Sequence, residues 1–157
     1  MSDLETTALR DLPESAYNFV CSSWVHSWRR RVGRNIDQDI YHRSFPKVAN
    51  HIASHELVRV LHFPGNTDFY LGWIATSGPE RLHYVYIRQN FRRQGNANTL
   101  IAAHTSKDAT YSLQPVTEWQ RLWLGRRMKH DPYQIAATLI GAHDEQATED
   151  DDDPRPR

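Results

Sequence analysis

Cysteine and long apolar runs are scarce in this sequence of 157 residues, and each scarcity excludes a class of protein. Cys21 is the single cysteine, so an internal disulfide is impossible and a reducing compartment is expected. No run reaches the ~18 apolar residues that a membrane-spanning helix needs. Residues 1–12 also lack the basic-then-apolar pattern of a secretory signal. We therefore expect a cytoplasmic protein that has no membrane partner.

The equal numbers of acidic and basic residues, 19 of each, conceal an uneven distribution. Residues 144–157 hold seven acids and two arginines, so the rest of the chain carries a net charge of about +5. Lysine is scarce in that part, where 14 of the 17 basic residues are arginine. Arginine suits phosphate-bearing ligands, although a GC-rich genome also favours it. We expect one domain over residues 1–142 and an acidic, disordered tail over 143–157.

The most informative stretch runs from Leu82 to Leu100 and reads LHYVYIRQNFRRQGNANTL. Its β-branched and aromatic beginning predicts a strand, and the apolar spacing after residue 96 predicts a helix. A basic loop that contains Gly95 joins the two. The first N–H groups of a helix lack acceptors within the helix and lie at the positive end of its dipole. This order of strand, glycine-bearing loop and helix is therefore typical of a phosphate-binding site.

The same residues resemble motif A of the GNAT N-acetyltransferase superfamily. The pattern Arg-x-x-Gly-x-Ala begins at Arg92, directly after Phe91, and an apolar pair in the strand precedes it. Asn96 departs from the family pattern, because the family usually has an apolar residue at that position. The resemblance implies an acetyl-CoA-dependent transferase. In that family the loop amides bind the pyrophosphate, and the backbone of the strand pairs with the pantetheine arm. The implied cofactor-binding residues are Val85, Ile87, Arg92, Arg93, Gln94, Gly95, Asn96 and Ala97.

Apolar spacing and turn residues predict the other elements of the chain. We expect strands at 7–12, 56–63, 70–76, 82–87 and 109–113, and helices at 14–33, 44–54, 96–106 and 117–128. Segment 35–43 is expected to be irregular or briefly helical, and residues 131–141 fit either a helix or a strand. The order β-α-α-β-β-β-α-β-α matches the GNAT core. The expected fold class is α/β (α+β), with a mixed, mainly antiparallel central sheet flanked by helices.

A narrower resemblance concerns the segments NFVCSSWVHSWRR, LGWIA and LHYVYIRQNFRRQGNA, which are similar to small GNAT-like proteins of tailed phages and prophages. Some relatives of that set modify bases in phage DNA, so the resemblance allows DNA as the acceptor and the host cytoplasm as the location. A third hypothesis is a non-catalytic protein that keeps the fold and binds a partner. The amine acceptor, small or macromolecular, and the oligomeric state stay open.

Acyl transfer to an amine needs a base that removes a proton from the ammonium group. In the GNAT family a carboxylate on the fourth strand, or a water chain, often serves as base, but here that strand has no acid after Glu80. His83, Tyr84 and Tyr86 are the nearest titratable groups. His83 has the most suitable ordinary pKa, whereas tyrosines in central strands commonly have structural roles. All three residues remain candidates beside that structural interpretation.

The reaction also needs an acid for the departing thiolate, which in many relatives is a tyrosine in the helix after the fifth strand. The expected helix at 117–128 contains no tyrosine, so Tyr111 becomes the candidate, ahead of Tyr133. On the acceptor side we consider His26 and Trp28, because GNAT folds build that site partly from the first two helices.

Two further groups of residues have competing interpretations. The basic segment 29–34 fits either a solvated helix end or a contact with nucleic acid. His51 and His55 stand four residues apart at a helix end, but the sequence offers no nearby third ligand, so no metal site is expected.

Overall fold

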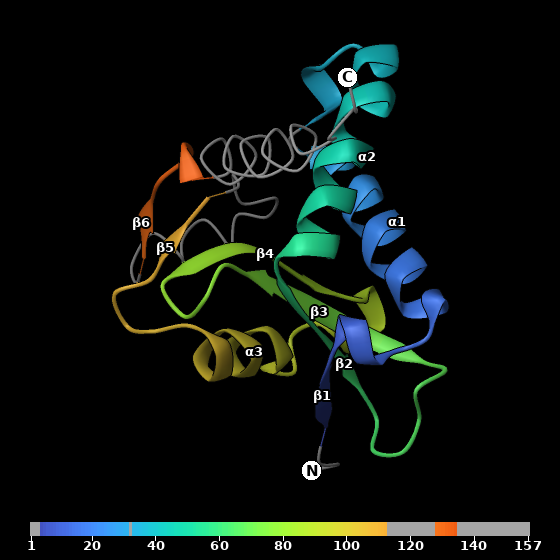
Figure 1. The fold of residues 1–157 in the computed structure, drawn as a ribbon, viewed down its shortest axis with the longest axis vertical. Helices are drawn as coiled ribbons and strands as arrows, with labels where there is room; N and C mark the ends of the chain where they lie inside the picture. Colours follow the sequence, from blue (N-terminus) through green and yellow to red (C-terminus); the bar gives the residue numbers. More distant parts are fainter. Residues whose placement is uncertain (1–3, 32, 113–127, 135–157) are drawn as a thin grey trace, which may run out of the picture.

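The structure is a computed structural model, and it describes residues 4–31, 33–112 and 128–134. Within these ranges six strands form one sheet in the order β1-β2-β3-β4-β5-β6, so strands that are consecutive in the chain lie side by side (Figure 1). β1 to β4 pair antiparallel, and β5 and β6 extend the sheet in parallel. The strands are Glu5–Ala8 (β1), Leu57–His62 (β2), Tyr70–Thr76 (β3), Arg81–Ile87 (β4), Thr110–Tyr111 (β5) and Lys129–His130 (β6). This mixed sheet confirms the expected fold class.

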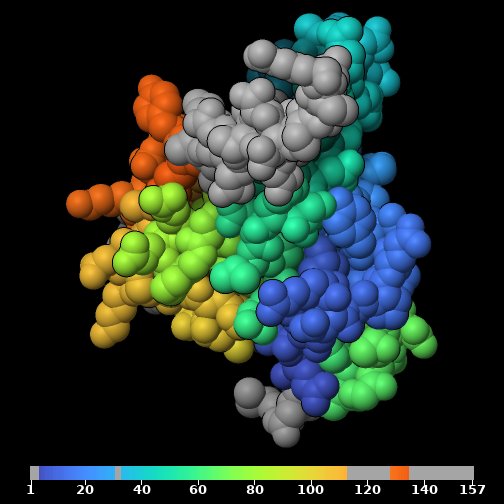
Figure 2. Space-filling model, viewed as in Figure 1, coloured from blue at the N-terminus to red at the C-terminus, as the bar shows by residue number. Residues whose placement is uncertain are grey.

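Helices cover both faces of the sheet. α1 (Glu14–Arg31) and α2 (Gln38–His55) lie side by side on one face, and α3 (Asn96–His104) lies on the other (Figure 1). Figure 2 shows the first turns of α2 (cyan) at the upper end of the molecule, with α1 (blue) beside the helix. In the described ranges no helix is both long and apolar enough to cross a membrane.

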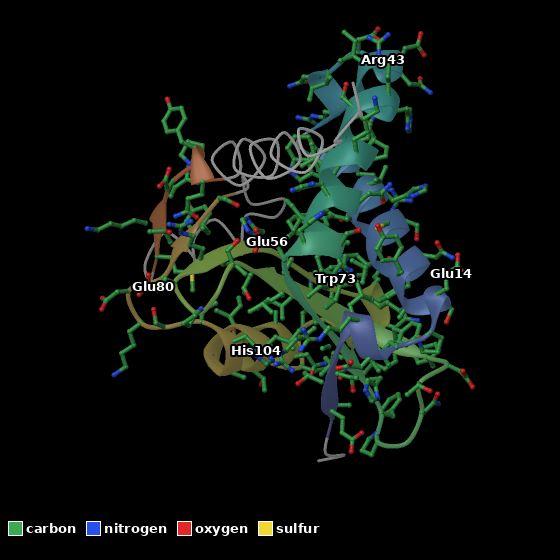
Figure 3. All side chains as sticks on the ribbon, viewed as in Figure 1. Glu14, Arg43, Glu56, Trp73, Glu80 and His104 are labelled. Atoms are coloured by element: carbon green, nitrogen blue, oxygen red, sulfur yellow. The ribbon has the colours of Figure 1, made fainter. Side chains whose placement is uncertain are left out.

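The sheet separates two apolar clusters, because alternate side chains of a strand point to opposite faces. The cluster under α1 and α2 is centred on Trp24, whose ring centroid lies 4.9 Å from that of Trp73 and 5.4 Å from that of Tyr84. Figure 3 shows Trp73 between the sheet and α1. The cluster under α3 contains Leu61, Leu71, Ile74, Leu82, Val85, Ile87, Leu100 and Ile101. Both clusters include residues of β4, so this strand is held from both faces.

Polar bonds join α1 to the aromatic residues of the sheet. Each connects a serine hydroxyl of α1 to the polar atom of a ring: Ser15 to the Tyr70 hydroxyl (3.0 Å), Ser23 to the Trp73 Nε1–H that donates to it (2.8 Å), and Ser27 to the Tyr84 hydroxyl (3.0 Å). The serines satisfy ring groups that are otherwise shielded from water, and an unsatisfied group there would cost free energy.

The beginning of α2 corrects the sequence prediction, which placed the start of this helix at residue 44. The helix begins earlier because the Asp37 carboxylate accepts hydrogen bonds from the backbone N–H groups of Asp39 (3.0 Å) and Ile40 (3.1 Å). Pro46 therefore lies inside the helix rather than in its first turn. The buried stripe of Tyr41, Phe45, Ala49 and Ile52 continues across the proline, and its packing outweighs the lost backbone bond.

The predicted first strand was also placed too late. β1 ends at Ala8, and residues Leu9–Asp11 form a 3₁₀ turn that Leu12 closes by donating to the Leu9 carbonyl at 3.1 Å. The predicted strands at 56–63, 70–76 and 82–87 and the helices at 14–33 and 96–106 are present within about two residues of their expected ends. The expected helix at 117–128 lies almost wholly outside the described residues, and so do most of 131–141 and the acidic tail.

Candidate functional site

The loop between β4 and α3 is anchored to the sheet before it changes direction. The Arg88 N–H donates to the Leu71 carbonyl (2.8 Å), and the Phe91 N–H donates to the Arg88 carbonyl (2.9 Å) within a 3₁₀ turn, Gln89–Phe91. The backbone then becomes left-handed at Arg93 (φ 64°) and again at Gly95 (φ 82°). Alternation of left- and right-handed residues turns successive N–H groups toward one side, which is the geometry of an anion-binding nest.

The backbone N–H groups of residues 93–98 have no acceptor among the described residues. The next N–H along the chain, that of Thr99, is the first to bond within the helix, to the Gly95 carbonyl at 3.0 Å. Gly95 is exposed, and a Cβ on it would project into open space. Because Gly95 is also the N-cap residue of α3, these donors stand at the positive end of the helix dipole. The arrangement fits a phosphate or pyrophosphate group.

Two side chains of the loop hold it in shape. Arg92 donates from Nε to the Ile87 carbonyl (2.7 Å), and its guanidinium carbon lies 5.8 Å from the centre of the Tyr86 ring. Asn96 donates from Nδ2 to the Phe91 carbonyl at 2.9 Å. This bond gives a physical reason for the amide at the position where GNAT proteins usually have an apolar residue. Arg93 is exposed and is free to add positive charge beside the N–H groups.

The remaining residues of the predicted cofactor site lie at the two ends of this loop. Val85 and Ile87 are buried in the cluster under α3, and Ala97 packs against the same cluster. Gln94 is exposed and donates to the Asn90 carbonyl at 3.4 Å. The structure thus brings the predicted residues together as one continuous segment, from the end of β4 to the first turn of α3.

The catalytic candidates of β4 occupy different environments. His83 is buried and uses both ring nitrogens, with Nε2 2.5 Å from the Ser77 hydroxyl and Nδ1 2.8 Å from the Ser112 hydroxyl. Burial lowers the pKa of His83, an effect that Glu56 opposes and Arg81 reinforces.

The tyrosines of β4 face α1 and α2. Tyr84 is 5% exposed and bonds to Ser27, and burial raises the pKa of its hydroxyl. Tyr86 is half-buried between the rings of Trp73 and Phe19, and its hydroxyl has no hydrogen-bond partner among the described residues. Tyr86 is therefore the candidate of β4 that a second molecule can reach most easily.

The other candidates lie outside β4, although Tyr111 of β5 pairs with Leu82 of β4. Tyr111 is 8% exposed and stacks on His130, with 4.7 Å between the ring centroids. Tyr133, the second choice for the acid, is 79% exposed. His26 is exposed on α1 and contacts the Ser22 carbonyl of its own helix at 3.1 Å.

Trp28 lies among aromatic rings at the end of α1. Its ring stacks on Phe45, with 4.5 Å between centroids, and on Tyr41, with 6.1 Å.

Arg29 donates to the carbonyls of Gly33 and Ile36, the latter at 2.8 Å. This arginine therefore stabilises the turn after α1, as expected for the helix-end interpretation of the basic segment.

Sequence reasoning missed Ser77 and Ser112, the two hydroxyl partners of His83. They stand far apart in the sequence, and serine in a turn or at a strand end is too common to indicate a contact. In the described ranges no group of three histidine, cysteine or carboxylate residues is arranged to hold a metal ion. His51 and His55 stack on one another, with 4.3 Å between ring centroids.

Comparison with solved structures shows which known proteins share this architecture. The GCN5-related N-acetyltransferase from Rhodopseudomonas palustris superposes with a TM-score of 0.52 at 13% identity, over 81% of this chain and 80% of that one. A protein described as a possible acetyltransferase from Clostridium difficile 630 gives a TM-score of 0.53 at 11% identity, over 80% and 90% of the two chains. The chain has the GNAT fold.

No family model and no curated protein matches the sequence. At the low identities of the two solved structures, the likeness to GNAT proteins is one of fold. The narrower resemblance to phage-encoded GNAT-like proteins stays a prediction.

Proposed function

We propose that this protein is an acyl-CoA-dependent N-acyltransferase that uses acetyl-CoA as donor and transfers the acyl group directly to an amine in a ternary complex. One observation carries the proposal: in a chain with the GNAT fold, the backbone N–H groups of residues 93–98 lack described acceptors at the N-terminus of α3. This is the segment in which the sequence resembles motif A. The fold and the local geometry therefore point to the same ligand.

The residues present fit the phosphate end of such a donor. The N–H groups of residues 93–98 would bind the pyrophosphate, Arg93 would add charge, and Arg92 and Asn96 would keep the loop in the required conformation. The bound donor would supply an acyl group already activated as a thioester. The backbone of β4 before the loop would then hold the pantetheine arm, with Val85 and Ile87 fixed by the cluster under α3.

For the proton of the amine, we propose Tyr86 among the candidates on β4. His83 uses both of its nitrogens for serine hydroxyls, and the Tyr84 hydroxyl bonds to Ser27, whereas the Tyr86 hydroxyl has no described partner. Tyr86 lies on the face of the sheet covered by α1 and α2. We propose that the acceptor amine approaches from this side, with His26 and the aromatic residues near Trp28 at its border. Tyr111 belongs to the cluster under α3, and we propose that it serves as the acid from β5, beside β4.

Calorimetric titration with acetyl-CoA tests the proposal, and two glycines provide a matched comparison. Gly95 and Gly78 both have positive φ (82° and 65°) and open space where a Cβ would stand, so Gly95→Ala and Gly78→Ala impose similar backbone strain. Only Gly95→Ala places a methyl group beside the proposed phosphate site. We expect it to weaken binding roughly 10–100-fold, the equivalent of one charge-assisted hydrogen bond, while Gly78→Ala binds like the wild type.

The outcomes separate the hypotheses. No binding of acetyl-CoA by the wild-type protein would refute the proposal. Binding without thiol release across a panel of amines would indicate a non-catalytic protein that keeps the fold. Equal losses of affinity in the two glycine variants would show that the loop at Gly95 does not bind acetyl-CoA.

A further inference from the structure

The imidazole of His83 is buried in the sheet with both of its nitrogens bonded, which is not the environment that a catalytic base needs. The side chain is 2% exposed, and each ring nitrogen lies within hydrogen-bond distance of a serine hydroxyl. A serine hydroxyl can both donate and accept, so the two serines satisfy a neutral imidazole in either tautomer. A base needs a nitrogen that can accept a proton from the substrate, and both nitrogens are occupied here.

The two serines that bond to His83 lie on different parts of the sheet. Ser77 lies in the turn between β3 and β4, and its N–H donates to the Arg81 carbonyl at 2.9 Å. Ser112 follows β5, and its N–H donates to the Leu82 carbonyl at 2.9 Å. His83 therefore connects the β3–β4 turn, β4 and the end of β5.

The bond from His83 to Ser112 comes directly after the paired segment of β4 and β5. The parallel pairs are Arg81 with Thr110 and Leu82 with Tyr111, and the next residue of each strand, His83 or Ser112, takes part in the side-chain bond. From residue 83 to the end of β4 at residue 87 the strand advances about 13 Å. The loop between β4 and α3 follows, and Arg88 anchors it to β3.

We propose that His83 is a positioning residue: through Ser112 it fixes the point at which β5 leaves β4, and thereby the part of β4, residues 84–87, that is presented to the acyl-CoA arm. This inference rests on the proposed function of the same site. The ligand would be held at one end by the loop and at the other by a strand edge whose beginning His83 defines. A small movement of β5 at that point shifts the reacting end of the donor, and misplacement by about 1 Å can cost roughly 100-fold in rate.

The two serines allow the positioning role to be separated from a merely structural one. Ser77→Ala and Ser112→Ala each remove one hydroxyl from the same buried ring and leave one nitrogen unpaired. We expect similar decreases in the midpoint of thermal unfolding, because the lost bonds have the same chemistry. Only Ser112→Ala releases β5, so only this variant should weaken acetyl-CoA binding, by about tenfold, whereas Ser77→Ala should stay within about twofold of the wild type.

Amide hydrogen exchange provides a readout that does not depend on the ligand. The N–H of residue 112, which donates to the Leu82 carbonyl, should exchange about tenfold faster in Ser112→Ala than in Ser77→Ala. Equal exchange in the two variants would overturn the proposed role of His83 even if acetyl-CoA does not bind at all. Binding by the wild type together with equal affinities of the two variants would overturn it while leaving the proposed function intact.

If Ser112→Ala does not fold, a second pair of variants replaces it. Ser112→Thr and Ser112→Val have the same shape and differ by one hydroxyl group. We expect the threonine variant to bind acetyl-CoA at least about tenfold more tightly than the valine variant, which corresponds to loss of the bond to His83. Equal affinity of these two variants would overturn the inference.

Discussion

Replacing Gly72 by alanine is expected to destabilise the protein because β3 and β4 approach too closely at this position for a side chain. Gly72 pairs with Ile87, the last residue of β4 before the loop to α3. An ideal Cβ on Gly72 would collide with the backbone carbonyl of Tyr86 and would lie 2.6 Å from Cδ1 and 3.2 Å from Cα of Ile87. The side chain of Ile87 can rotate, but the carbonyl oxygen belongs to the paired strand and can move only with it.

The size of the effect follows from two opposing contributions. Overpacking in a close-packed region costs about 1–3 kcal/mol, and the alanine recovers about 0.4–1 kcal/mol by restricting the unfolded chain. The expected net loss is about 1–2 kcal/mol. For a chain of this size 1 kcal/mol corresponds to a shift of about 2–4 °C, so the unfolding midpoint of Gly72→Ala should fall by roughly 2–8 °C.

Thermal unfolding followed by circular dichroism measures this shift, with Gly65→Ala as the control. Gly65 has a positive φ of 67° and open space around its missing side chain, so the control carries backbone strain without a collision. Because Ile87 leads into the loop, Gly72→Ala should also weaken acetyl-CoA binding, whereas Gly65→Ala should not. If Gly72→Ala proves as stable as the wild type, β3 and β4 are not as close as the structure places them, and the reasoning fails.

Two further predictions concern buried polar groups. Thr7→Val removes the hydroxyl that lies 2.8 Å from Nε2 of buried His62, and should lower the free energy of unfolding in urea by about 1–3 kcal/mol. Thr7→Ser should stay close to the wild type, and equal stability of all three proteins would contradict the prediction. Burial raises the pKa of Tyr41 to about 12, and its hydroxyl donates to the Val25 carbonyl at 2.5 Å. The contribution of the protonated hydroxyl to the free energy of unfolding is therefore complete below pH 10 and is lost as the pH rises toward 12. Urea unfolding between pH 9 and 11 should therefore show a shallower loss of stability in Tyr41→Phe than in the wild type, and parallel curves would refute this assignment.

The two central strands, β3 and β4, could be predicted from the sequence because their signals are local. β3 and β4 are runs of apolar and aromatic residues between clear turn signals, and their predicted bounds agree with the structure to within one residue. The beginning of α2 could not be predicted in the same way. Ser44 followed by Pro46 has the pattern of a helix start, whereas the cap at Asp37 competes with it and is favoured by the burial of Tyr41, which depends on tertiary packing.

In the candidate site, too, the features that depend on local sequence could be predicted and those that depend on tertiary contacts could not. The loop between β4 and α3 is one continuous segment, and its glycine and the apolar pattern around it predict a strand, a turn and a helix, so the sequence alone locates the proposed phosphate site. The environment of His83 depends on Ser77 and Ser112, which only the folded sheet brings to it. An ordinary pKa near neutrality made this histidine the natural candidate for a base, but burial and the two hydroxyls change what the same side chain can do.

The serines that bond α1 to rings of the sheet have a mechanical consequence. The hydrophobic effect is nondirectional, so apolar burial alone sets the position of a helix on a sheet less sharply than hydrogen bonds do. Hydrogen bonds have fixed lengths and angles, and Ser15 and Ser27 make theirs near opposite ends of α1, to Tyr70 of β3 and Tyr84 of β4. Two such points on different strands fix both the axial position and the rotation of the helix. α1 is thus a rigid wall beside β4, and changes on its solvent side can accumulate without moving the strand that it covers.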